Sequence, residues 1–166
     1  MARIERVGHT VLYVSDVARS VEFYRDKLGM EVTKWPESPG AFMSFGRQHH
    51  DIALFKVRGE PTRGTLGLSH VAFVIEGGTE ELKELHDELE SRGVEILQKI
   101  DYGYTRSFYL SDPDGNRIEL YCELLEPVAA KRYLASRSSS GMGFEWDQVL
   151  DSAGKSAPGV SVLHAE

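Results

Sequence analysis

The sequence predicts an α+β fold built from two β-α-β-β-β modules, whose curved mixed sheets form a cleft. Three observations predict it. The order of elements repeats within the chain, a histidine occupies the same place in the first strand of each half, and a glutamate lies within the last strand of the second half. An internal repeat is a stronger signal than any single motif, because it constrains the whole architecture.

The first half opens with a strand over Val7–Val14, rich in β-branched and aromatic residues. Ser15 and Asp16 then offer N-cap oxygens to a helix over Val17–Leu28, where apolar residues recur at helical spacing. Gly29 is a typical helix stop. Three strands are expected to follow, separated by turns: Glu31–Trp35, Ala41–Phe45 and His49–Val57. A loop, Pro36–Gly40, joins the first two of them.

The second half follows a linker at Arg58–Gly67, which contains three glycines and a proline. The strand Leu68–Ile75 matches the first strand of the chain, and Thr79 is expected to cap a helix that Gly93 ends. A turn, Asp112–Asn116, combines Pro, Gly and Asx residues, as β-turns require. The remaining predicted strands are Val94–Leu97, Phe108–Leu110 and Arg117–Cys122.

The chain of 166 residues fits one compact domain over residues 1–125, with modules at about 4–58 and 67–125. Residues 126–166 form a C-terminal extension whose role the pattern does not indicate. It contains two possible short helices, Val128–Ala135 and Glu145–Leu150, separated by Ser136–Gly141, and its end reads as a loosely ordered tail.

Composition excludes several classes of protein. The formal net charge of −7 argues against nucleic acid as a partner, because a phosphate backbone requires a basic face. The apolar runs have strand length, so no membrane span is expected, and Met1–Arg6 has no hydrophobic signal region. The single cysteine, Cys122, cannot form an internal disulfide and is expected to be buried. These features predict a cytoplasmic protein.

Candidate metal ligands come from both halves. His9 and His70 occupy equivalent positions in repeated strands, and Glu119 interrupts the apolar pattern of its own strand. For each residue alone, a hydrogen-bonded core histidine or a solvent-facing glutamate is the simpler interpretation. Together, two imidazoles and one carboxylate form the facial triad that holds Fe(II), or sometimes Mn(II) or another divalent metal, with open positions. The repeat therefore favours a metal-binding cleft.

Four stretches resemble the vicinal oxygen chelate superfamily, which includes glyoxalase I, fosfomycin and bleomycin resistance proteins and type I extradiol dioxygenases. They are the His9 strand Val7–Val14, the helix end Phe23–Gly29, the His70 strand Leu68–Phe73, and Tyr109–Tyr121 with its Asp-Pro-Asp-Gly-Asn turn. The resemblance covers about residues 4 to 124. It implies the same paired-module fold and the ligand set His9, His70 and Glu119.

Three features resemble the single-domain extradiol branch more than the others. The segment Arg47–Phe55 is similar to the one that carries the acid–base histidine, and His50 matches that residue. Tyr109 stands ten residues before Glu119, the spacing of the tyrosine that bonds the metal-bound substrate oxygen. Ala53 stands where glyoxalase-like members have a fourth ligand. One position departs from the branch, since Tyr102 replaces a frequent histidine.

The resemblance implies an extradiol dioxygenase that opens a catecholic ring with O2, with His50 and Tyr109 as catalytic residues and Fe(II) as the preferred metal. The ring substituents are not indicated. Three alternatives stay open: a fosfomycin-resistance-type transferase, a glyoxalase-type lyase, which Ala53 disfavours, and a bleomycin-binding protein that needs no metal. Exposed strand edges and the extension also predict a homodimer or larger homo-oligomer.

The other candidate residues are weaker. His49 is expected to be a neighbour of His50, and His86 to lie on an exposed charged helix face. His164 is assigned no role. Arg106 has two interpretations, an anion-binding group or a surface salt bridge.

Overall fold

The computed structural model describes residues 6–35, 40–59, 67–136 and 141–150. Most of the expected Pro36–Gly40 loop, Arg58–Gly67 linker and Ser136–Gly141 segment lies outside these residues, as does the tail with His164. Within the described part of the chain, no helix has both the length and the apolar character needed to cross a membrane.

The order of elements confirms the predicted repeat. The first set is β1 (Thr10–Val14), α1 (Val17–Asp26), β2 (Glu31–Lys34), β3 (Gly40–Ser44) and β4 (Ile52–Lys56). The second set is β5 (Val71–Val74), α2 (Thr79–Ser91), β6 (Gln98–Asp101), β7 (Thr105–Ser111) and β8 (Arg117–Glu123). The chain therefore contains the sequence β-α-β-β-β twice, as the hydrophobic periodicity predicted.

The strand orders of the two sheets repeat as well. The four-stranded sheet has the order β1-β4-β3-β2, and the five-stranded sheet has the order β5-β8-β7-β6-β9. In the first sheet β1 runs parallel to β4, whereas β3 is antiparallel to both β2 and β4. In each sheet the first strand of the set is an edge strand beside the last. This mixed-sheet α+β architecture confirms the predicted fold class.

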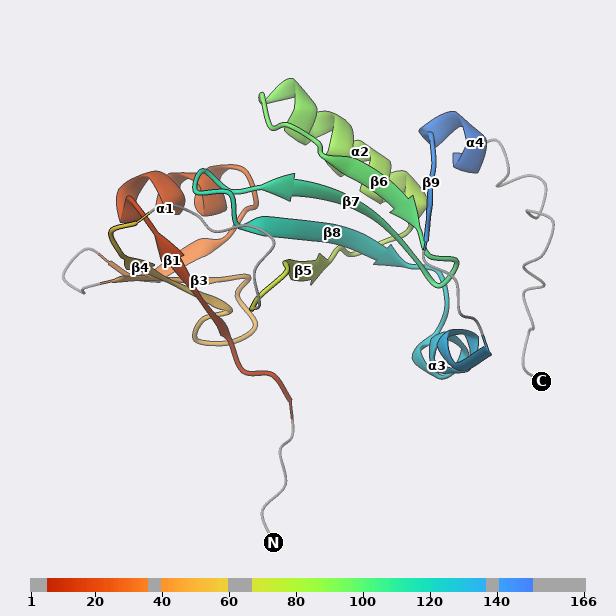
Figure 1. Ribbon diagram of the computed structural model, residues 1–166, viewed down its shortest axis with the longest axis horizontal. Helices are drawn as coiled ribbons and strands as arrows, with labels where there is room; N and C mark the ends of the chain where they lie inside the picture. The colour runs from red at the N-terminus through yellow and green to blue at the C-terminus, as the bar shows by residue number, and fades with distance from the viewer. Residues whose placement is uncertain (1–5, 36–39, 60–66, 137–140, 151–166) are drawn as a thin grey trace, which may run out of the picture. The chain divides into compact units, whose positions relative to one another are not determined.

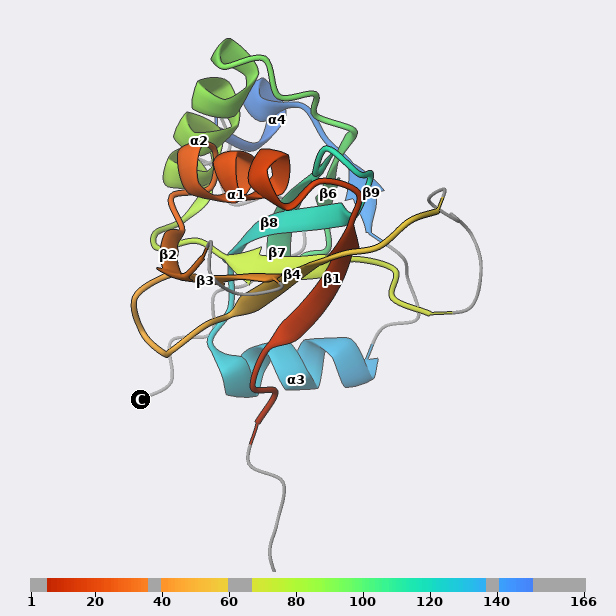
Figure 2. The same ribbon diagram turned by 90° about the vertical axis from the view of Figure 1, so that its left-hand side faces the viewer.

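The chain divides into two compact units, Met1–Val71 with Ser111–Arg117, and Ala72–Leu110 with Ile118–Glu166. In the first unit α1 lies along one face of the four-stranded sheet (Figures 1 and 2). Leu12 and Val14 are buried while Val11 and Tyr13 of the same strand are exposed, the alternation expected of a half-covered sheet. The side chain of Asp16 caps α1 by accepting from the amide of Arg19 at 3.0 Å.

The turn between β7 and β8 belongs to the first unit and has the predicted turn chemistry. The carboxylate oxygen Oδ1 of Asp112 accepts from the amides of Asp114 at 2.9 Å and Asn116 at 2.8 Å. Gly115 has a φ of 83°, which favours glycine. Tyr24 of α1 donates its hydroxyl to Asp112 Oδ2 at 3.1 Å in a buried contact. This hydrogen bond therefore links the Asp112–Asn116 turn to helix α1.

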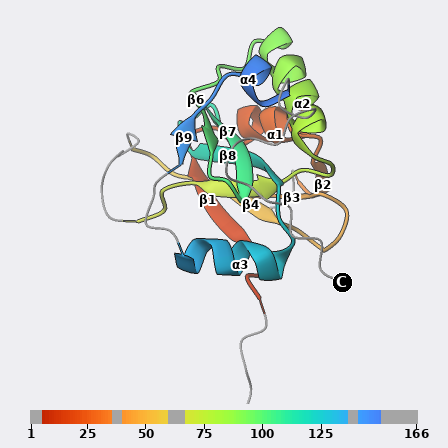
Figure 3. The same ribbon diagram turned by 90° about the vertical axis from the view of Figure 1, so that its right-hand side faces the viewer.

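In the second unit, α2 lies over one face of the five-stranded sheet and α3 (Pro127–Ser136) over the opposite face (Figures 1 and 3). Leu82 and Leu89 of α2 are fully buried. The extension also contains β9 (Met142–Gly143), which pairs antiparallel with β6, and α4 (Trp146–Leu150), which lies beside α2. The helices α3 and α4 match the two expected in the extension; β9 was not predicted.

Three local predictions are wrong. Residues 94–97 are not a strand, because the chain reaches the edge of β7 only at Leu97 and pairs as β6 from Gln98. Thr79 is the first residue of α2, not its cap. Its hydroxyl accepts from Arg106 at 2.5 Å instead, and the Glu81 carboxylate accepts from the Gly78 amide at 2.7 Å. The last strand of the first half begins at Ile52, so His49 and His50 precede it.

Candidate metal and catalytic site

The two candidate histidine ligands occupy equivalent places in the structure. His9 immediately precedes β1, and His70 immediately precedes β5, so both lie one residue outside the strands in which they were expected. His9 is exposed and His70 is half-buried, with the Nδ1 atom of His70 lying 3.3 Å from Ser69 Oγ. Each imidazole is therefore presented at the start of an edge strand.

His50 lies next to His9 in the first unit. It sits in the turn before β4, with its ring centroid 4.3 Å from that of His9. The ring of Phe42 packs edge-on against it at 5.0 Å. The structure thus brings the predicted acid–base histidine to one of the predicted metal ligands, although 41 positions of sequence separate them (50 − 9).

The surroundings of His50 favour its neutral form. Partial desolvation, followed by the charges of His9 and His49, lowers the pKa of the His50 imidazole. His49 is the neighbour that was expected, with its Nδ1 atom 2.5 Å from Nδ1 of His50. A neutral imidazole can accept a proton, so this arrangement suits a general base.

Glu119 is buried within the second unit. It lies on β8, which is flanked by β5 and β7, so the solvent-facing interpretation on an edge strand is excluded. Its residue exposure is only 9%, and Ser107 Oγ donates to Glu119 Oε1 at 2.6 Å. Glu119 alternates along the strand with Ile118 and Leu120, which are also buried. The carboxylate is therefore held on a strand that is paired on both sides.

Tyr109 lies beside Glu119 on the neighbouring strand β7. Its hydroxyl oxygen is 2.8 Å from the hydroxyl oxygen of Tyr102, and its side chain also hydrogen-bonds Glu119. Desolvation, these hydrogen bonds and the Glu119 charge raise the pKa of Tyr109 well above its usual value. The phenol therefore stays protonated at neutral pH and can act as a hydrogen-bond donor.

Ala53 offers no ligand atom. It is buried on β4, where it pairs in register with Val11 on β1 and with Phe42 on β3. Those two neighbours are apolar, and a methyl group cannot coordinate a metal. Position 53 of the first module therefore supplies no side-chain oxygen, although the resemblance to glyoxalase-like proteins would predict a ligand there.

Arg106 has a structural role in the described part of the chain. Its guanidinium contacts Asp101 Oδ2 through Nε at 2.9 Å and through Nη2 at 2.6 Å, and its Nη1 donates to Thr79. It also lies 5.6 Å above the ring of Phe144. Of the two interpretations of Arg106, the structure favours the salt bridge, although the bridge is only partly exposed. Cys122 is buried, as predicted.

The expectation for His86 is wrong, because its side chain is buried. Only 6% of the side chain is exposed, and its ring lies edge-on to Phe108 at 5.4 Å and to Trp146 at 5.1 Å. Helical spacing places His86 on the same face as Leu82 and Leu89, a signal that the charged neighbours concealed. Trp146 comes from the C-terminal extension, so sequence alone did not predict what covers His86.

His86 also belongs to a cluster of three possible ligands on α2. The imidazole and the carboxylates of Asp87 and Glu90 have ligand atoms within 4.8 Å of one another. Both carboxylates are exposed, and Asp87 is already bonded to Lys83. This group resembles a solvated helix face more than a built metal centre, since exposed acidic groups gather commonly on helices.

Comparison with known proteins agrees with the fold and with the residues of the repeat. Residues 6–120 match the Glyoxalase/Bleomycin resistance protein/Dioxygenase superfamily, and the chain belongs to this superfamily. The matched residues include every predicted ligand and catalytic position and stop before α3. The resemblance based on the histidine strands and the Glu119 hairpin is therefore confirmed at the level of the superfamily.

Among the relatives are two enzymes of Rhodococcus globerulus. Biphenyl-2,3-diol 1,2-dioxygenase 3 is 34% identical over 120 residues, covering 69% of this chain and 62% of that protein. The chain thus spans slightly less than two thirds of that relative. Biphenyl-2,3-diol 1,2-dioxygenase 2 is 30% identical over 160 residues, covering 90% of this chain and 81% of that protein.

Other similar proteins are named for glutathione transfer or for fosfomycin resistance. Glutathione transferase FosA of Serratia marcescens is 29% identical over 148 residues, covering 87% of this chain and 99% of that protein. The solved structure of a mutant of the fosfomycin resistance protein FosX of Listeria monocytogenes, complexed with Mn(II) and 1S,2S-dihydroxypropylphosphonic acid, has a TM-score of 0.61 and 26% identity. The match covers 79% of this chain and 99% of that chain.

Proposed function

We propose that this protein is a metal-dependent extradiol dioxygenase that cleaves a catecholic ring next to its diol. The arrangement that carries the proposal is Tyr109, held protonated against the buried carboxylate of Glu119. A protonated phenol beside a candidate ligand is suited to stabilise a deprotonated substrate oxygen. The sequence identity of 34% and 30% with two biphenyl-2,3-diol 1,2-dioxygenases supports ring cleavage as the reaction class.

His9, His70 and Glu119 would hold the metal, with Fe(II) as our first choice and Mn(II) or another divalent ion as the alternative. Two imidazoles and one carboxylate are a donor set suited to these ions. The hydrogen bond from Ser107 to Glu119 fits this role, because ligating carboxylates are commonly oriented by a second partner. When bound, the ion would lower the pKa of a catechol hydroxyl and hold the diol and O2 together.

His50 would move the substrate proton. Its Nδ1 atom faces His49, so we assign proton transfer to the other ring nitrogen, Nε2. A neutral imidazole there would accept the proton of the second catechol hydroxyl and return it to an oxygen atom during ring opening. Because the ring of His50 lies against the ring of His9, this base would stay close to the substrate oxygens that bind the metal.

Tyr109 would hydrogen-bond the catecholate oxygen. Tyr102 supports it in this role, since the 2.8 Å contact between the hydroxyls limits where the Tyr109 oxygen can lie. Tyrosine at position 102 is a poor proton shuttle near neutral pH, because the ordinary tyrosine pKa is about 10. Its contribution is therefore positional, and proton transfer is left to His50.

The test is oxygen consumption by protein reconstituted anaerobically with Fe(II), using a panel of monocyclic and bicyclic catechols. Ring cleavage next to the diol leaves a conjugated hydroxy-dienal or hydroxy-dienoate, so a yellow product should appear with one O2 consumed per ring. Protein loaded with Zn(II), which has no redox chemistry, is the control. Full iron occupancy without O2 uptake on any catechol would rule out the proposal.

A metal-dependent thiol transferase is the second candidate. The observation that favours it is coverage, since the alignment with the FosA relative spans 99% of that protein. Such a reaction also needs a divalent metal, but as a Lewis acid and without O2. Incubation with Mn(II), K+, a thiol and an epoxide phosphonate, followed by mass spectrometry, distinguishes it, because only a transferase forms the thiol adduct.

We further propose that the protein works in the cytoplasm as a homodimer or larger homo-oligomer. Both histidine-bearing segments lead into β1 and β5, which are edge strands of the two described sheets, and an edge strand is a common place for another chain to pair. Sedimentation equilibrium tests this directly. A single species at 18.6 kDa, the mass of one chain, would contradict the oligomer.

A further inference from the structure

The helix α3 lies outside the superfamily match, yet it faces the Glu119 side of the five-stranded sheet. The match ends at residue 120, and α3 spans Pro127–Ser136. Figures 1 and 3 place α3 across the sheet from α2. Because Ile118, Leu120 and Cys122 alternate with Glu119 along β8, the carboxylate points to the face opposite theirs. Cys122 hydrogen-bonds the side chain of Thr79, the first residue of α2, so Ile118, Leu120 and Cys122 face α2. Glu119 therefore faces away from α2.

A pocket of about 300 Å³ lies between this face of the sheet and α3, entirely within the second unit. Glu119 and Tyr121 line it from β8, and Ala72 lines it from β5. The opposite wall is aliphatic: Leu125, Ala130 and Leu134. The candidate metal ligand Glu119 thus lines one side of the pocket, and an apolar surface that includes α3 lines the opposite side.

The wall is held in a defined position by Tyr133. Its hydroxyl lies so close to Gly103 that a Cβ built there would be 1.9 Å away, and Gly103 also has a φ of +79°. The ring of Tyr133 lies 6.1 Å from the ring of Tyr104, and Leu124 donates its amide to the carbonyl of Tyr104 at 2.9 Å. These contacts attach α3 to the turn between β6 and β7. They therefore fix the position of Ala130 and Leu134 at the pocket.

We infer that α3 forms the subsite for an apolar ring substituent of the catecholic substrate. This rests on the proposed function, because Glu119 marks the end of the pocket where the diol would bind. A substituent pointing away from Glu119 would meet Leu125, Ala130 and Leu134. The extension would then select the substrate, while residues 6–120 carry the chemistry.

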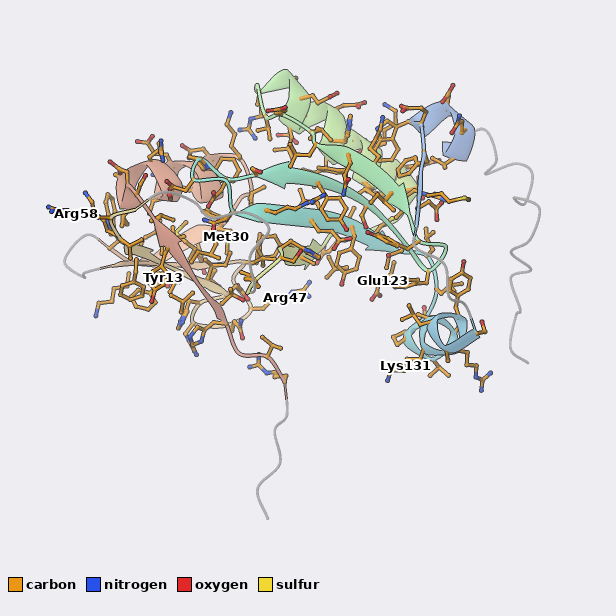
Figure 4. All side chains as sticks on the ribbon, viewed as in Figure 1. Tyr13, Met30, Arg47, Arg58, Glu123 and Lys131 are labelled. Carbon is orange, nitrogen blue, oxygen red and sulfur yellow. The ribbon has the colours of Figure 1, made fainter. Side chains whose placement is uncertain are left out.

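The charges around the pocket favour a neutral substituent over an anionic one. Among the lining residues, two are carboxylates, Glu119 and Glu123, and one is a cation, Lys131. Lys131 is exposed, and Figure 4 shows it on α3 at the same end of the sheet as Glu123. A long lysine at such a rim keeps its ammonium in water and lines the wall with its stem. A carboxylate on the catechol ring would therefore add little binding affinity in this pocket.

The experiment compares two adjacent alanines of α3. Ala130 lines the pocket and is half-buried, whereas Ala129 is exposed and does not line it. With the iron-loaded protein, Ala130→Phe should lower kcat/KM for 3-isopropylcatechol by about tenfold or more, since filling a pocket excludes the group that occupied it. It should leave unsubstituted catechol within about twofold, and Ala129→Phe should change neither substrate. Equal losses on both substrates, or no loss, would overturn the subsite.

Binding separates failure of the subsite from failure of the reaction. Amide chemical shifts of Ala130 and Leu134, measured with 3-isopropylcatechol and with 2,3-dihydroxybenzoate, report occupancy without turnover. Large shifts only with the isopropyl compound, abolished by Ala130→Phe, support the apolar subsite even if no ring is cleaved. Larger shifts with the benzoate, lost in Lys131→Gln, would overturn it in favour of an anion site. Ring cleavage without shifts at either position would leave the reaction standing and refute the subsite.

Discussion

The phenolic oxygens of Tyr102 and Tyr109 lie 2.8 Å apart, and Tyr109 is in turn hydrogen-bonded to Glu119. The resemblance to extradiol enzymes predicts a histidine at the position where Tyr102 stands. Here the tyrosine is linked to the residue that we propose as the donor to the substrate. Gly141 of the extension passes so close to Tyr102 that an added Cβ would lie 2.6 Å from its ring.

Removing either hydroxyl should lower turnover, and by different amounts. Tyr109→Phe loses a hydrogen bond to a charged oxygen, worth about 1.5–3 kcal/mol, so kcat should fall by about 10- to 150-fold. Tyr102→Phe loses only a neutral bond, worth about 0.5–1.5 kcal/mol, and should cost about 2- to 12-fold. Steady-state kinetics with one catechol measures both. A larger loss from Tyr102→Phe would make Tyr102 the direct donor.

Glu119→Gln should weaken metal binding while the protein stays folded. The amide keeps the size of the side chain and can still bond Ser107, but it lacks the negative charge that favours a divalent cation. Iron content after dialysis and the far-ultraviolet circular dichroism spectrum are the two measurements. Glu123→Gln is the matched control, because Glu123 is an exposed carboxylate four residues further along β8 (123 − 119). Equal iron in the two variants would remove Glu119 from the ligand set.

His50→Phe should retain iron and bind catechol but lose most turnover. The loss of a positioned acid–base group typically lowers the rate by about 10²–10⁴. His49→Phe removes the contact with His50 Nδ1 but leaves the His50 imidazole in place, so its loss of turnover should be much smaller. Iron analysis, catechol titration and O2 uptake separate binding from chemistry. If cleavage persists in His50→Phe, another residue carries the proton.

The buried contact between Tyr24 and Asp112 predicts a loss of stability at high pH. Desolvation, followed by the Asp112 charge, raises the pKa of Tyr24 well above its usual value of 10.0. The unfolded chain therefore releases this proton first, so the contribution is intact below about pH 10 and falls as pH rises towards the folded-state pKa. Thermal unfolding between pH 8 and 11 should show a shallower decline in Tyr24→Phe. Tyr13→Phe, at an exposed position, should follow the wild type.

The Trp146 contact with His86 predicts that α4 stabilises the second unit. Trp146 is 8% exposed and packs edge-on against both His86 and Phe144. Trp146→Ala should lower the free energy of unfolding by about 3 kcal/mol, the lower end for deleting a large buried aromatic. Urea denaturation measures this. Met142→Ala, at a residue that is 76% exposed, should change it little, and similar losses from both would contradict a specific role for the tryptophan.

The sequence by itself determined the repeat, the α+β class and the superfamily. Local periodicity indicates helix α1 and most of the strands, and the Asp112–Asn116 turn is indicated by local hydrogen bonds from the amides of Asp114 and Asn116 to the Asp112 carboxylate. The histidines could be matched between halves because each precedes the first strand of its set. Such features depend on neighbours in the chain, so one sequence is sufficient to predict them.

Tertiary structure alone decided the features that depend on distant residues. Glu119 is buried on β8, which lies between β5 and β7. The alternation of apolar and polar residues along one strand does not predict the order of strands in the sheet. Thr79 binds Arg106 instead of capping its helix, and His86 is covered by Trp146, 60 positions later (146 − 86). In each case the side chain's environment is set by packing between segments far apart in the chain, where burial outweighs local preference.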